Sequence, residues 1–360
     1  MDERLQRELI DPACSEWASN VVMVKKGEGS LRFCVGYRQL NERTRKDSYP
    51  LPSIDVCLDA LAGAAWFSTF DLRSGYHQVE MEPSDADKTT FVTRRGTFKF
   101  NVMPFGLCNA PATFQRLMNV AMAGLDPLVC LVYLDDIIVH STNLHDHVDR
   151  LRLLFDRLLE TGLKLKVGKC RLLRTEVGFL GHRVSAGGLA PDPGKIEAVR
   201  GWPTPRCLRE TRAFLGLCSY YRKFLGGFAH IAAPLHALTK KNKPFVWDTA
   251  CQDAFETLKG CLVSAPVLAL PHDDGLYVLD TDASEVAIGV VLSQVQGGIE
   301  KVVAYYSRLY TQSEVNYCTT RKELLAVVEG LRQFRPYVLG RHCVVRTDHA
   351  ALRWFGELLI

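Results

Sequence analysis

The feature that most constrains this chain is a pair of adjacent aspartates inside an apolar, β-branched run. Residues 131–139 read LVYLDDIIV, and no Lys, Arg or His lies among them. A buried carboxylate without a partner is costly, so two together call for a cation from elsewhere. We interpret the run as a β-hairpin with buried strands and with Asp135 and Asp136 at its tip, presented to divalent metal. The alternative is an Asp-Asp turn without chemistry, and the run alone does not decide between them.

Size and composition indicate a globular chain of two or three domains. The chain has 360 residues, of which 47% are hydrophobic and 23% charged, and its net charge of +4 permits nucleic-acid binding without requiring it. Its 12 cysteines include no C-x2-C pair, which argues against a zinc cluster or disulfide framework and predicts reduced thiols inside a cell. The charged N-terminus and the lack of a run of about 20 apolar residues argue against a signal peptide or membrane span.

Apolar periodicity predicts sheet elements on both sides of the aspartate pair. We expect a hairpin from strands 21–24 and 31–37 joined by a turn over 26–29, and a strand over 65–72 that ends at Asp71. Other predicted elements before the pair are the end of a helix over 2–10, a helix beginning at Ser53, a hairpin over 91–102, and a helix over 112–123 introduced by Pro111.

A second sheet is predicted in the C-terminal part of the chain. Strands over 276–282, 286–293 and 302–306, a helix over 321–334 and a strand over 342–347 follow one another, an order typical of a separate mixed-sheet domain. Between the two sheets we expect helices over 145–159, 195–201, 208–224 and 250–262 and a hairpin over 173–184.

Three carboxylates are thereby expected on neighbouring positions of the first sheet. Asp71 ends one strand, and Asp135 and Asp136 lie at a hairpin tip. Two Mg²⁺ ions held about 3.5–4 Å apart by shared carboxylates stabilise the attacking and leaving oxygens of a phosphoryl displacement. The pattern therefore favours a polymerase or a nuclease.

Three stretches carry specific motifs in order: FDLRSGYHQ at 70–78, MPFGLCNAPATFQ at 103–115 and YLDD at 133–136. They resemble reverse transcriptases, in particular those of Ty3/gypsy long-terminal-repeat retrotransposons, and the stretches at 38–41, 178–182, 202–205 and 214–224 agree. The resemblance covers nearly the whole chain. It implies an α+β fold, a right-hand polymerase followed by a partial ribonuclease H-like α/β domain. The implied domains are fingers and palm over 1–162, thumb and connection over 163–272, and the ribonuclease H-like domain over 273–360.

The resemblance also implies roles for single residues. Asp71, Asp135 and Asp136 match the catalytic, metal-binding triad, with Asp71 and Asp135 as the more direct ligands. Tyr76 matches an aromatic that excludes ribonucleotides at the sugar 2′ position, although a core aromatic beside a turn is the alternative. Phe105 and Gly106 match a segment that packs against nucleotide and template. Gln115 lies on the helix behind that segment, where a structural role is favoured over a catalytic one.

Basic residues are implied to hold phosphates. Lys26 and Arg32 match the pair that binds the nucleotide triphosphate, and Lys25 competes with Lys26 for this role. Gly36 departs from the family, which usually has an acidic residue there. A further basic cluster suits a primer-template duplex, although an exposed basic face is the alternative for any single member: Lys164, Lys166, Lys169, Arg171, Arg174, Arg222 and Lys223.

A second set of carboxylates resembles the ribonuclease H domain of the same family. The motifs are LDTDAS at 279–284, RKELLA at 321–326 and RTDH at 346–349, and Asp282, Glu323 and Asp348 match three of four metal ligands. The implied chemistry is two-metal hydrolysis of the RNA strand of an RNA–DNA hybrid. As alternatives, Asp282 caps the turn to Ser284, Glu323 closes a capping box with Thr320, and Asp348 is an exposed strand end. The fourth ligand would lie beyond Ile360, so we expect a truncated, impaired domain.

The resulting prediction is an RNA-directed DNA polymerase that extends a primer by two-metal nucleotidyl transfer, using Mg²⁺ or Mn²⁺ with two ions per active site. The implied partners are RNA and DNA template-primer, RNA–DNA hybrid, dNTPs and other parts of a Pol polyprotein, with no membrane. The implied location is intracellular, in a cytoplasmic virus-like particle with access to the nucleus. The alternatives are a catalytically inactive, retroelement-derived nucleic-acid-binding protein and a host protein that reuses the fold for protein contacts.

Overall fold

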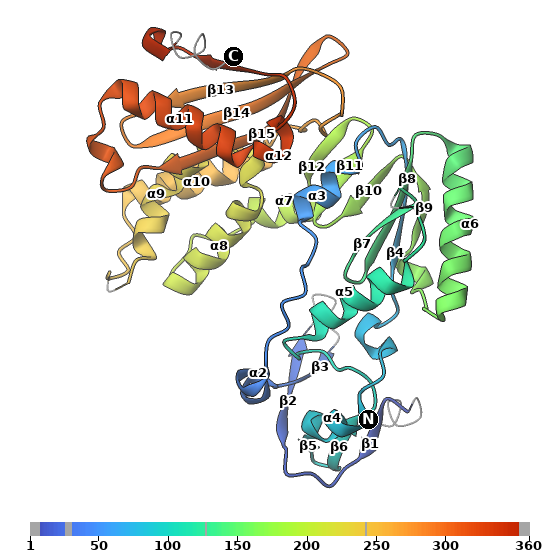
Figure 1. The fold of residues 1–360 in the computed structure, drawn as a ribbon. Helices are drawn as coiled ribbons and strands as arrows, with labels where there is room; N and C mark the ends of the chain where they lie inside the picture. The colour runs from blue at the N-terminus through green and yellow to red at the C-terminus, as the bar shows by residue number, and fades with distance from the viewer. Residues whose placement is uncertain (1–7, 26–30, 127, 242, 353–360) are drawn as a thin grey trace. The chain divides into compact units, whose positions relative to one another are not determined.

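The computed structural model describes residues 8–25, 31–126, 128–241 and 243–352 (Figure 1). It contains the predicted mixture of helix and sheet, with four sheets among these residues. The chain divides into two units, the first comprising residues 1–57 and 64–177 and the second residues 58–63 and 178–360. The domain limits at 162 and 272 stay predictions. No helix in the described ranges combines the length and apolar character needed to cross a membrane.

The first unit begins with a five-stranded sheet in the order β1-β6-β5-β2-β3. Its strands are β1 (Ile10–Pro12), β2 (Ser19–Lys25), β3 (Leu31–Val35), β5 (Phe91–Thr93) and β6 (Gly96–Phe100). Both predicted hairpins are present, with the turn over 26–29 outside the described residues. The prediction of helix at residue 10 is wrong, because Ile10 pairs with Phe100 and is fully buried among aromatic side chains. The predicted helix over 2–7 lies outside the described residues.

A second, four-stranded sheet of the first unit has the order β7-β8-β4-β9. Its strands are β4 (Trp66–Asp71), β7 (Cys130–Tyr133), β8 (Asp136–Ser141) and β9 (Arg171–Arg174). Helices α5 (Ala110–Ala121) and α6 (Leu144–Thr161) pack on it, and Phe114, Leu154 and Ile137 are fully buried in the shared core. Asn143 caps the start of α6, and Gly162 at φ 70° ends it. Both helices were predicted.

Short elements complete the first unit. They are α2 (Arg38–Arg43), α3 (Ile54–Asp59), η1 (Gly75–Gln78), α4 (Pro83–Ala86), η2 (Asp87–Thr89) and η3 (Val167–Lys169). The last residues of α3 belong to the second unit.

The next part of the chain carries a three-stranded sheet and four helices. Strands β10 (Glu176–Phe179), β11 (His182–Ser185) and β12 (Gly188–Pro191) precede α7 (Pro193–Arg200), α8 (Leu208–Tyr220), α9 (Phe228–Leu238) and α10 (Thr249–Val263), with η4 (Arg222–Phe224) between α8 and α9. The predicted hairpin over 173–184 is wrong at its start, because residues 171–174 pair with β4 instead.

Two of the sequence motifs meet in this region. The hydroxyl groups of Tyr220 and Tyr221 donate to the carbonyl oxygens of Leu180 and Gly181, each at 2.6 Å. The ring of His182 lies 5.3 and 5.4 Å from the two tyrosine rings. The stretches at 178–182 and 214–224 therefore form one packed unit that joins the β10–β11 turn to α8.

The C-terminal sheet has the order β15-β14-β13-β16. Its elements are β13 (Tyr277–Ala283), β14 (Ala287–Gln296), β15 (Ile299–Leu309), η5 (Glu314–Asn316), α11 (Thr319–Gln333), α12 (Arg335–Val338), β16 (Cys343–Thr347) and η6 (Ala350–Leu352), in the predicted order. Strand β16 runs parallel to β13. Helix α11 approaches the sheet closely at Gly330, where a Cβ would lie 3.0 Å from Val290 and 3.2 Å from Leu279.

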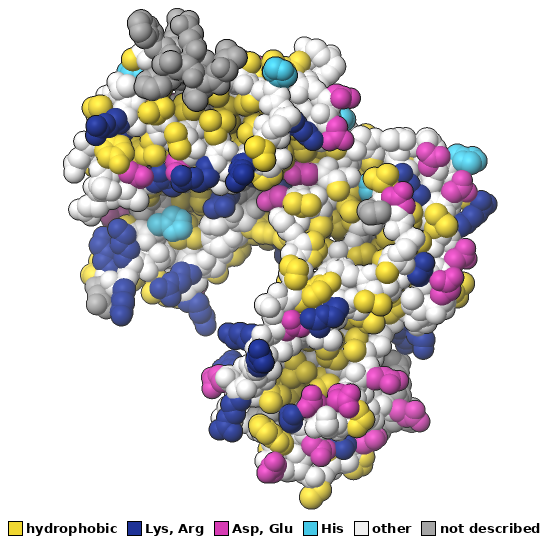
Figure 2. All heavy atoms as spheres, viewed as in Figure 1, with side chains coloured by type: hydrophobic (Ala, Val, Ile, Leu, Met, Phe, Trp, Pro, Cys, Tyr) yellow, Lys and Arg dark blue, Asp and Glu magenta, His cyan; other side chains and the backbone are white. Residues whose placement is uncertain are grey.

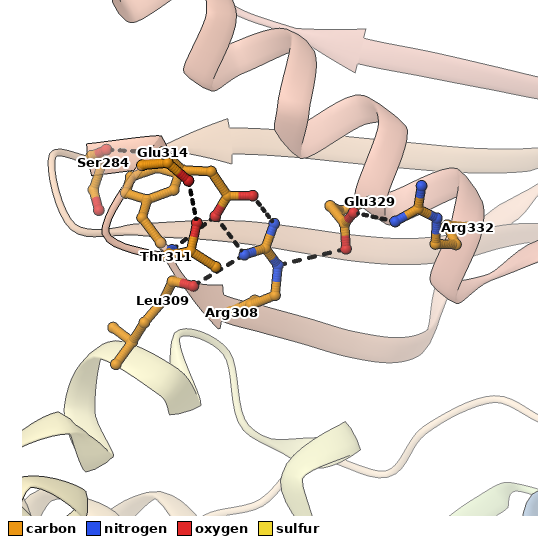
Figure 3. Close-up of polar contacts among 9 residues, drawn as sticks. Ser284, Arg308, Leu309, Thr311, Glu314, Glu329 and Arg332 are labelled. Carbon is orange, nitrogen blue, oxygen red and sulfur yellow. Dashed lines mark hydrogen bonds and ion pairs between the residues drawn. The ribbon is translucent and has the colours of Figure 1, made fainter. Parts of the chain in front are cut away.

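Arg308 anchors the connection from β15 to α11 (Figure 3). Its guanidinium donates to both carboxylate oxygens of Glu314, at 2.8 and 3.2 Å, and lies 3.4 Å from Glu329. Glu314 also accepts from the backbone N–H of Thr311, and these contacts lower its pKa to about 2. The bidentate pair fixes the loop after β15 to β15 itself, and the contact with Glu329 joins Arg308 to α11.

Candidate active sites

The three carboxylates of the first site come from two neighbouring strands and one turn. Asp71 ends β4 and lies opposite Asp136, the first residue of β8. Asp135 occupies the turn before β8, and its Oδ1 atom is buried with no hydrogen-bond partner among the described residues. The predicted position of the hairpin tip is one residue off, since the turn is Leu134–Asp135 and Asp136 belongs to the strand.

A side chain distant in the sequence holds this turn. Leu134 has a φ of 51°, and its backbone N–H donates to Oε1 of Gln115 at 2.8 Å. The amide nitrogen of Gln115 donates to Asn119 at 3.0 Å and to the Val132 carbonyl at 3.4 Å. Gln115 is only 1% exposed. Gln115 therefore has the structural role that was favoured, since its hydrogen bonds join α5 to the hairpin.

The electrostatics of this site favour a cation. Burial and the neighbouring carboxylates of Asp136 and Asp71 raise the pKa of Asp135 to about 6. Asp136 is more exposed, yet the surrounding protein and Asp71 raise its pKa as well. A buried oxygen without a partner, beside two further carboxylates, suits a hard divalent ion, because such ions prefer oxygen ligands.

Lys169 already partners one of these carboxylates. Its Nζ lies 2.7 Å from Oδ2 of Asp71. The positive charge of Lys169 offsets part of the rise in the pKa of Asp135 and of Asp136. Across the part of the chain that the structure describes, no three acidic, histidine or cysteine side chains are yet grouped closely enough to hold one ion. The sequence placed Lys169 only in a general basic cluster and gave no sign that it contacts the triad.

An aromatic group borders the carboxylates. The half-buried ring of Tyr76 lies 5.1 Å from Phe105 and 5.4 Å from Phe114. Burial and Asp135 raise the pKa of the Tyr76 hydroxyl. Phe105 is 45% exposed, so Tyr76 and Phe105 together form an apolar surface beside the charged site. Both residues were predicted to contact nucleotide or template.

Gly106 follows Phe105 in a conformation that favours glycine. Its φ is 102°, and a Cβ would lie 3.3 Å from the Val35 carbonyl oxygen. Asn41 braces this turn, donating to the Gly106 carbonyl at 2.8 Å and accepting from the Cys108 N–H at 2.9 Å. The sequence pointed to the stretch at 38–41 but not to this bracing role.

The predicted triphosphate contacts are described only in part. Lys26 lies outside the described residues. Arg32 stands in β3 opposite Val24, with its side chain also outside them. Lys25 pairs with Leu31 at the end of the same hairpin and is exposed.

Two carboxylates of the second set lie at the ends of two parallel strands, and the third comes from helix α11. Thr281 on β13 pairs with Thr347 on β16, so Asp282 and Asp348 each follow a paired position. Glu323 on α11 is 5% exposed, and its Oε2 atom has no hydrogen-bond partner in the described ranges. Burial and the charges of Asp348 and Asp282 raise the pKa of Glu323. These oxygens also fit a divalent ion.

Two structural alternatives at this site are not supported. Cys318 holds the N-cap position of α11 without a side-chain hydrogen bond, and Thr320 lies inside the helix with its hydroxyl 2.9 Å from Nε2 of His349. Glu323 therefore closes no capping box with Thr320. The turn after Asp282 is held by Ser284, whose hydroxyl accepts from the N–H groups of Val286 and Ala287. Asp348 is exposed and directly follows β16, so the third alternative, an exposed strand end, agrees with its position.

Comparisons with protein families match both parts of the chain. Residues 24–184 match the family described as reverse transcriptase (RNA-dependent DNA polymerase). Residues 247–345 match the family described as RNase H-like domain found in reverse transcriptase. The two matched ranges contain all six predicted carboxylates except Asp348.

Several curated proteins are similar to almost the whole chain. The retrovirus-related Pol polyprotein from transposon 297 of Drosophila melanogaster is 42% identical over 99% of this chain and 34% of its own length. The corresponding polyprotein from transposon 412 is 37% identical over 99% of this chain and 29% of its own length. The transposon Tf2-3 polyprotein of Schizosaccharomyces pombe is 35% identical over 93% of this chain and 25% of its own length. The chain thus spans about a third or less of these relatives.

Solved structures confirm the fold. The foamy viral protease–reverse transcriptase dRH in complex with double-stranded DNA matches 99% of this chain and 62% of its own, with a TM-score of 0.88 and 23% identity. The same kind of protein in complex with an RNA/DNA hybrid matches 99% of this chain and 51% of its own, with a TM-score of 0.83 and 22% identity.

Proposed function

The chain belongs to the reverse transcriptases of Ty3/gypsy-type retrotransposon Pol polyproteins, and from this premise we propose that it is an RNA-directed DNA polymerase that extends a primer on an RNA or DNA template. The observation that carries the proposal is the buried, unpartnered Oδ1 of Asp135 beside the carboxylates of Asp71 and Asp136. The family matches support this interpretation over an inactive nucleic-acid-binding relic.

In the proposed mechanism Asp71, Asp135 and Asp136 would hold two divalent ions, Mg²⁺ or Mn²⁺. When bound, such ions would lower the pKa of the primer 3′-hydroxyl and offset the negative charge that develops on the α-phosphate and the pyrophosphate leaving group. The chain's own residues position the reactants. The apolar surface of Tyr76 and Phe105 receives the sugar and base of the nucleotide, and Lys26 and Arg32 hold its phosphates.

Basic surface outside the site suits the nucleic-acid substrate. Figure 2 shows Lys and Arg side chains gathered near the start of α8 and the end of α9. The exposed basic residues in these stretches are Arg209 and Arg212 at the start of α8, and Lys240, Lys241 and Lys243 just after α9. Such side chains bind phosphates without reading sequence. The structural neighbours were solved with double-stranded DNA and with RNA/DNA hybrid, and we propose both as ligands here. Other parts of a Pol polyprotein and an intracellular, particle-associated location belong to the same proposal.

Primer extension tests the main proposal. The parent chain, Asp135→Asn and the control Asp156→Asn, which changes an exposed aspartate on α6, are compared on an RNA template with Mg²⁺ or Mn²⁺. We expect the parent and Asp156→Asn to extend the primer and Asp135→Asn to lose extension while still binding the duplex. Equal extension by all three proteins would refute the assignment of the site.

We also propose that Asp282, Glu323 and Asp348 would hold divalent metal at a second site and support hydrolysis of the RNA strand of a hybrid, at the impaired level expected when three of the four family ligands are present. The observation in favour is the buried, unpartnered Oε2 of Glu323 beside two exposed carboxylates. A hydrolysis assay on labelled hybrid with the 360-residue chain tests this, with Asp282→Asn as the variant expected to lose cleavage.

A further inference from the structure

Lys169 is held beside the triad by the backbone on both sides of it. On one side, the Lys166 N–H donates to the Asp71 carbonyl, and the Arg73 N–H donates to the Lys164 carbonyl, both at 2.8 Å. On the other side, Arg171 in β9 pairs with Thr69 in β4. The strand that carries Asp71 therefore also fixes the segment that carries Lys169. These backbone contacts place Lys169 next to Asp71.

The Gln78 side chain strengthens this attachment. Its amide nitrogen donates to the carbonyls of Arg73 and Lys164, at 3.0 and 3.1 Å, and its oxygen accepts from the Lys164 N–H at 2.8 Å. One glutamine thereby bridges the segment after β4 and the segment before η3. These three hydrogen bonds rigidify the junction and hold the Lys164 backbone in one place relative to β4.

The ion pair is nevertheless replaceable. The Lys169 side chain is 56% exposed and that of Asp71 is 26% exposed, so the ammonium group has open solvent into which it can swing. Asp71 uses its Oδ2 for Lys169, while Oδ1 of Asp135 stays unpartnered. The lysine thus neutralises part of the triad's charge without satisfying the oxygen that a divalent ion would bind.

We propose that Lys169 competes with divalent metal for Asp71. Its ammonium group pairs with the Asp71 carboxylate before an ion binds, and it weakens ion binding until the lysine is displaced. The inference rests on the proposed function, because it takes the triad as the metal site. Its consequence is that the triad alone binds divalent ions weakly and avoids stable occupancy when no nucleotide is bound.

Mn²⁺ binding to the full chain, followed by electron paramagnetic resonance of free Mn²⁺ without nucleotide or nucleic acid, tests the inference. Asp282→Asn and Asp348→Asn are introduced in every protein so that only the first site is measured. On this background we compare the parent, Lys169→Met, Lys169→Arg and the matched control Lys195→Met. Lys195 is an exposed lysine on α7 that belongs to neither carboxylate site.

We expect Lys169→Met to bind Mn²⁺ about tenfold more tightly, because a unit positive charge is removed within a few ångströms of the ion. Lys169→Arg keeps the charge and should stay within about twofold of the parent, and Lys195→Met should be unchanged. Equal or weaker binding by Lys169→Met would overturn the inference, as would undetectable binding by both it and the parent. Binding that persists in Asp135→Asn would instead contradict the triad as the metal site.

Discussion

Gly75 lies so close to Asp135 that a Cβ on the glycine would be 2.1 Å from Oδ1 and 2.9 Å from Cγ of the aspartate. The same Cβ would lie 3.0 Å from the ring of Phe114 in the buried core. The position of the Asp135 carboxylate therefore depends on the absence of a side chain at residue 75.

Gly75→Ala should displace the Asp135 carboxylate and lower kcat/KM of primer extension by about 100-fold, because misplacement of a catalytic group by about an ångström has effects of this size. Steady-state extension kinetics measure the loss. Gly216→Ala is the control, since a Cβ on this α8 residue would meet nothing within 4 Å. Full activity in Gly75→Ala would show that the site tolerates a moved carboxylate.

Metal binding at the first site should weaken in mild acid. The pKa of Asp135 is raised to about 6, and a carboxylate has to be ionised to bind a cation, so Mn²⁺ affinity should fall as the pH drops below about 6. Titrations with Mn²⁺ between pH 5 and pH 8 would check this. An affinity that stays constant down to pH 5 would contradict the role of Asp135 as a ligand.

Asp135→Asn should stabilise the metal-free chain near neutral pH. The folded pKa of Asp135 lies above its ordinary value of 3.8, so ionisation costs stability as the pH rises from about 4 to about 6. Because the group is partly exposed, we expect a gain of only about 1 kcal/mol. Urea unfolding in EDTA at pH 7.5 measures it, and a less stable variant would contradict the expected sign.

A buried histidine should give the opposite pH dependence. His140 is 6% exposed, and burial together with Arg150 and His147 lowers its pKa from 6.5 to about 4. The unfolded chain then binds the additional proton, so stability falls as the pH drops from 6.5 towards 4, by up to about 3 kcal/mol. Urea unfolding of the parent and His140→Leu at pH 7 and pH 5 would isolate this effect. A parallel pH dependence in the two proteins would rule it out.

Glu323→Gln should abolish hybrid cleavage and leave primer extension intact. The change removes a buried carboxylate charge near Asp282 and Asp348 while keeping the side-chain shape. We expect at least about a 100-fold loss of cleavage. Glu285→Gln, at an exposed position before β14, is the control. Cleavage by Glu323→Gln at the parental rate would remove Glu323 from the site.

The sequence predicted the strands that carry the carboxylates because their patterns are local. In the strand that ends at Asp71 and in the strands near Asp282 and Asp348, apolar residues either alternate with polar ones or form a continuous run. Turn-forming residues lie at the ends of these strands. Helix α9 was not predicted, since Pro234 lies inside it and proline is a signal against helix. The Lys169–Asp71 pair joins residues 98 positions apart, a separation at which local patterns carry no information.

The contact between Gln115 and Leu134 implies an unequal distribution of mutational tolerance. The backbone N–H of residue 134, not its side chain, makes the hydrogen bond that sets the turn. Residue 134 should therefore drift among side chains that accept a positive φ, whereas Gln115 supplies a group that few other residues can replace. In a saturation library scored by primer extension, we expect position 134 to tolerate Gly, Asn and Asp beside Leu, because its φ is 51°, and position 115 to tolerate almost no replacement of Gln. The residue that most constrains the conformation of the hairpin turn would then be Gln115, which lies on α5 and not in the hairpin.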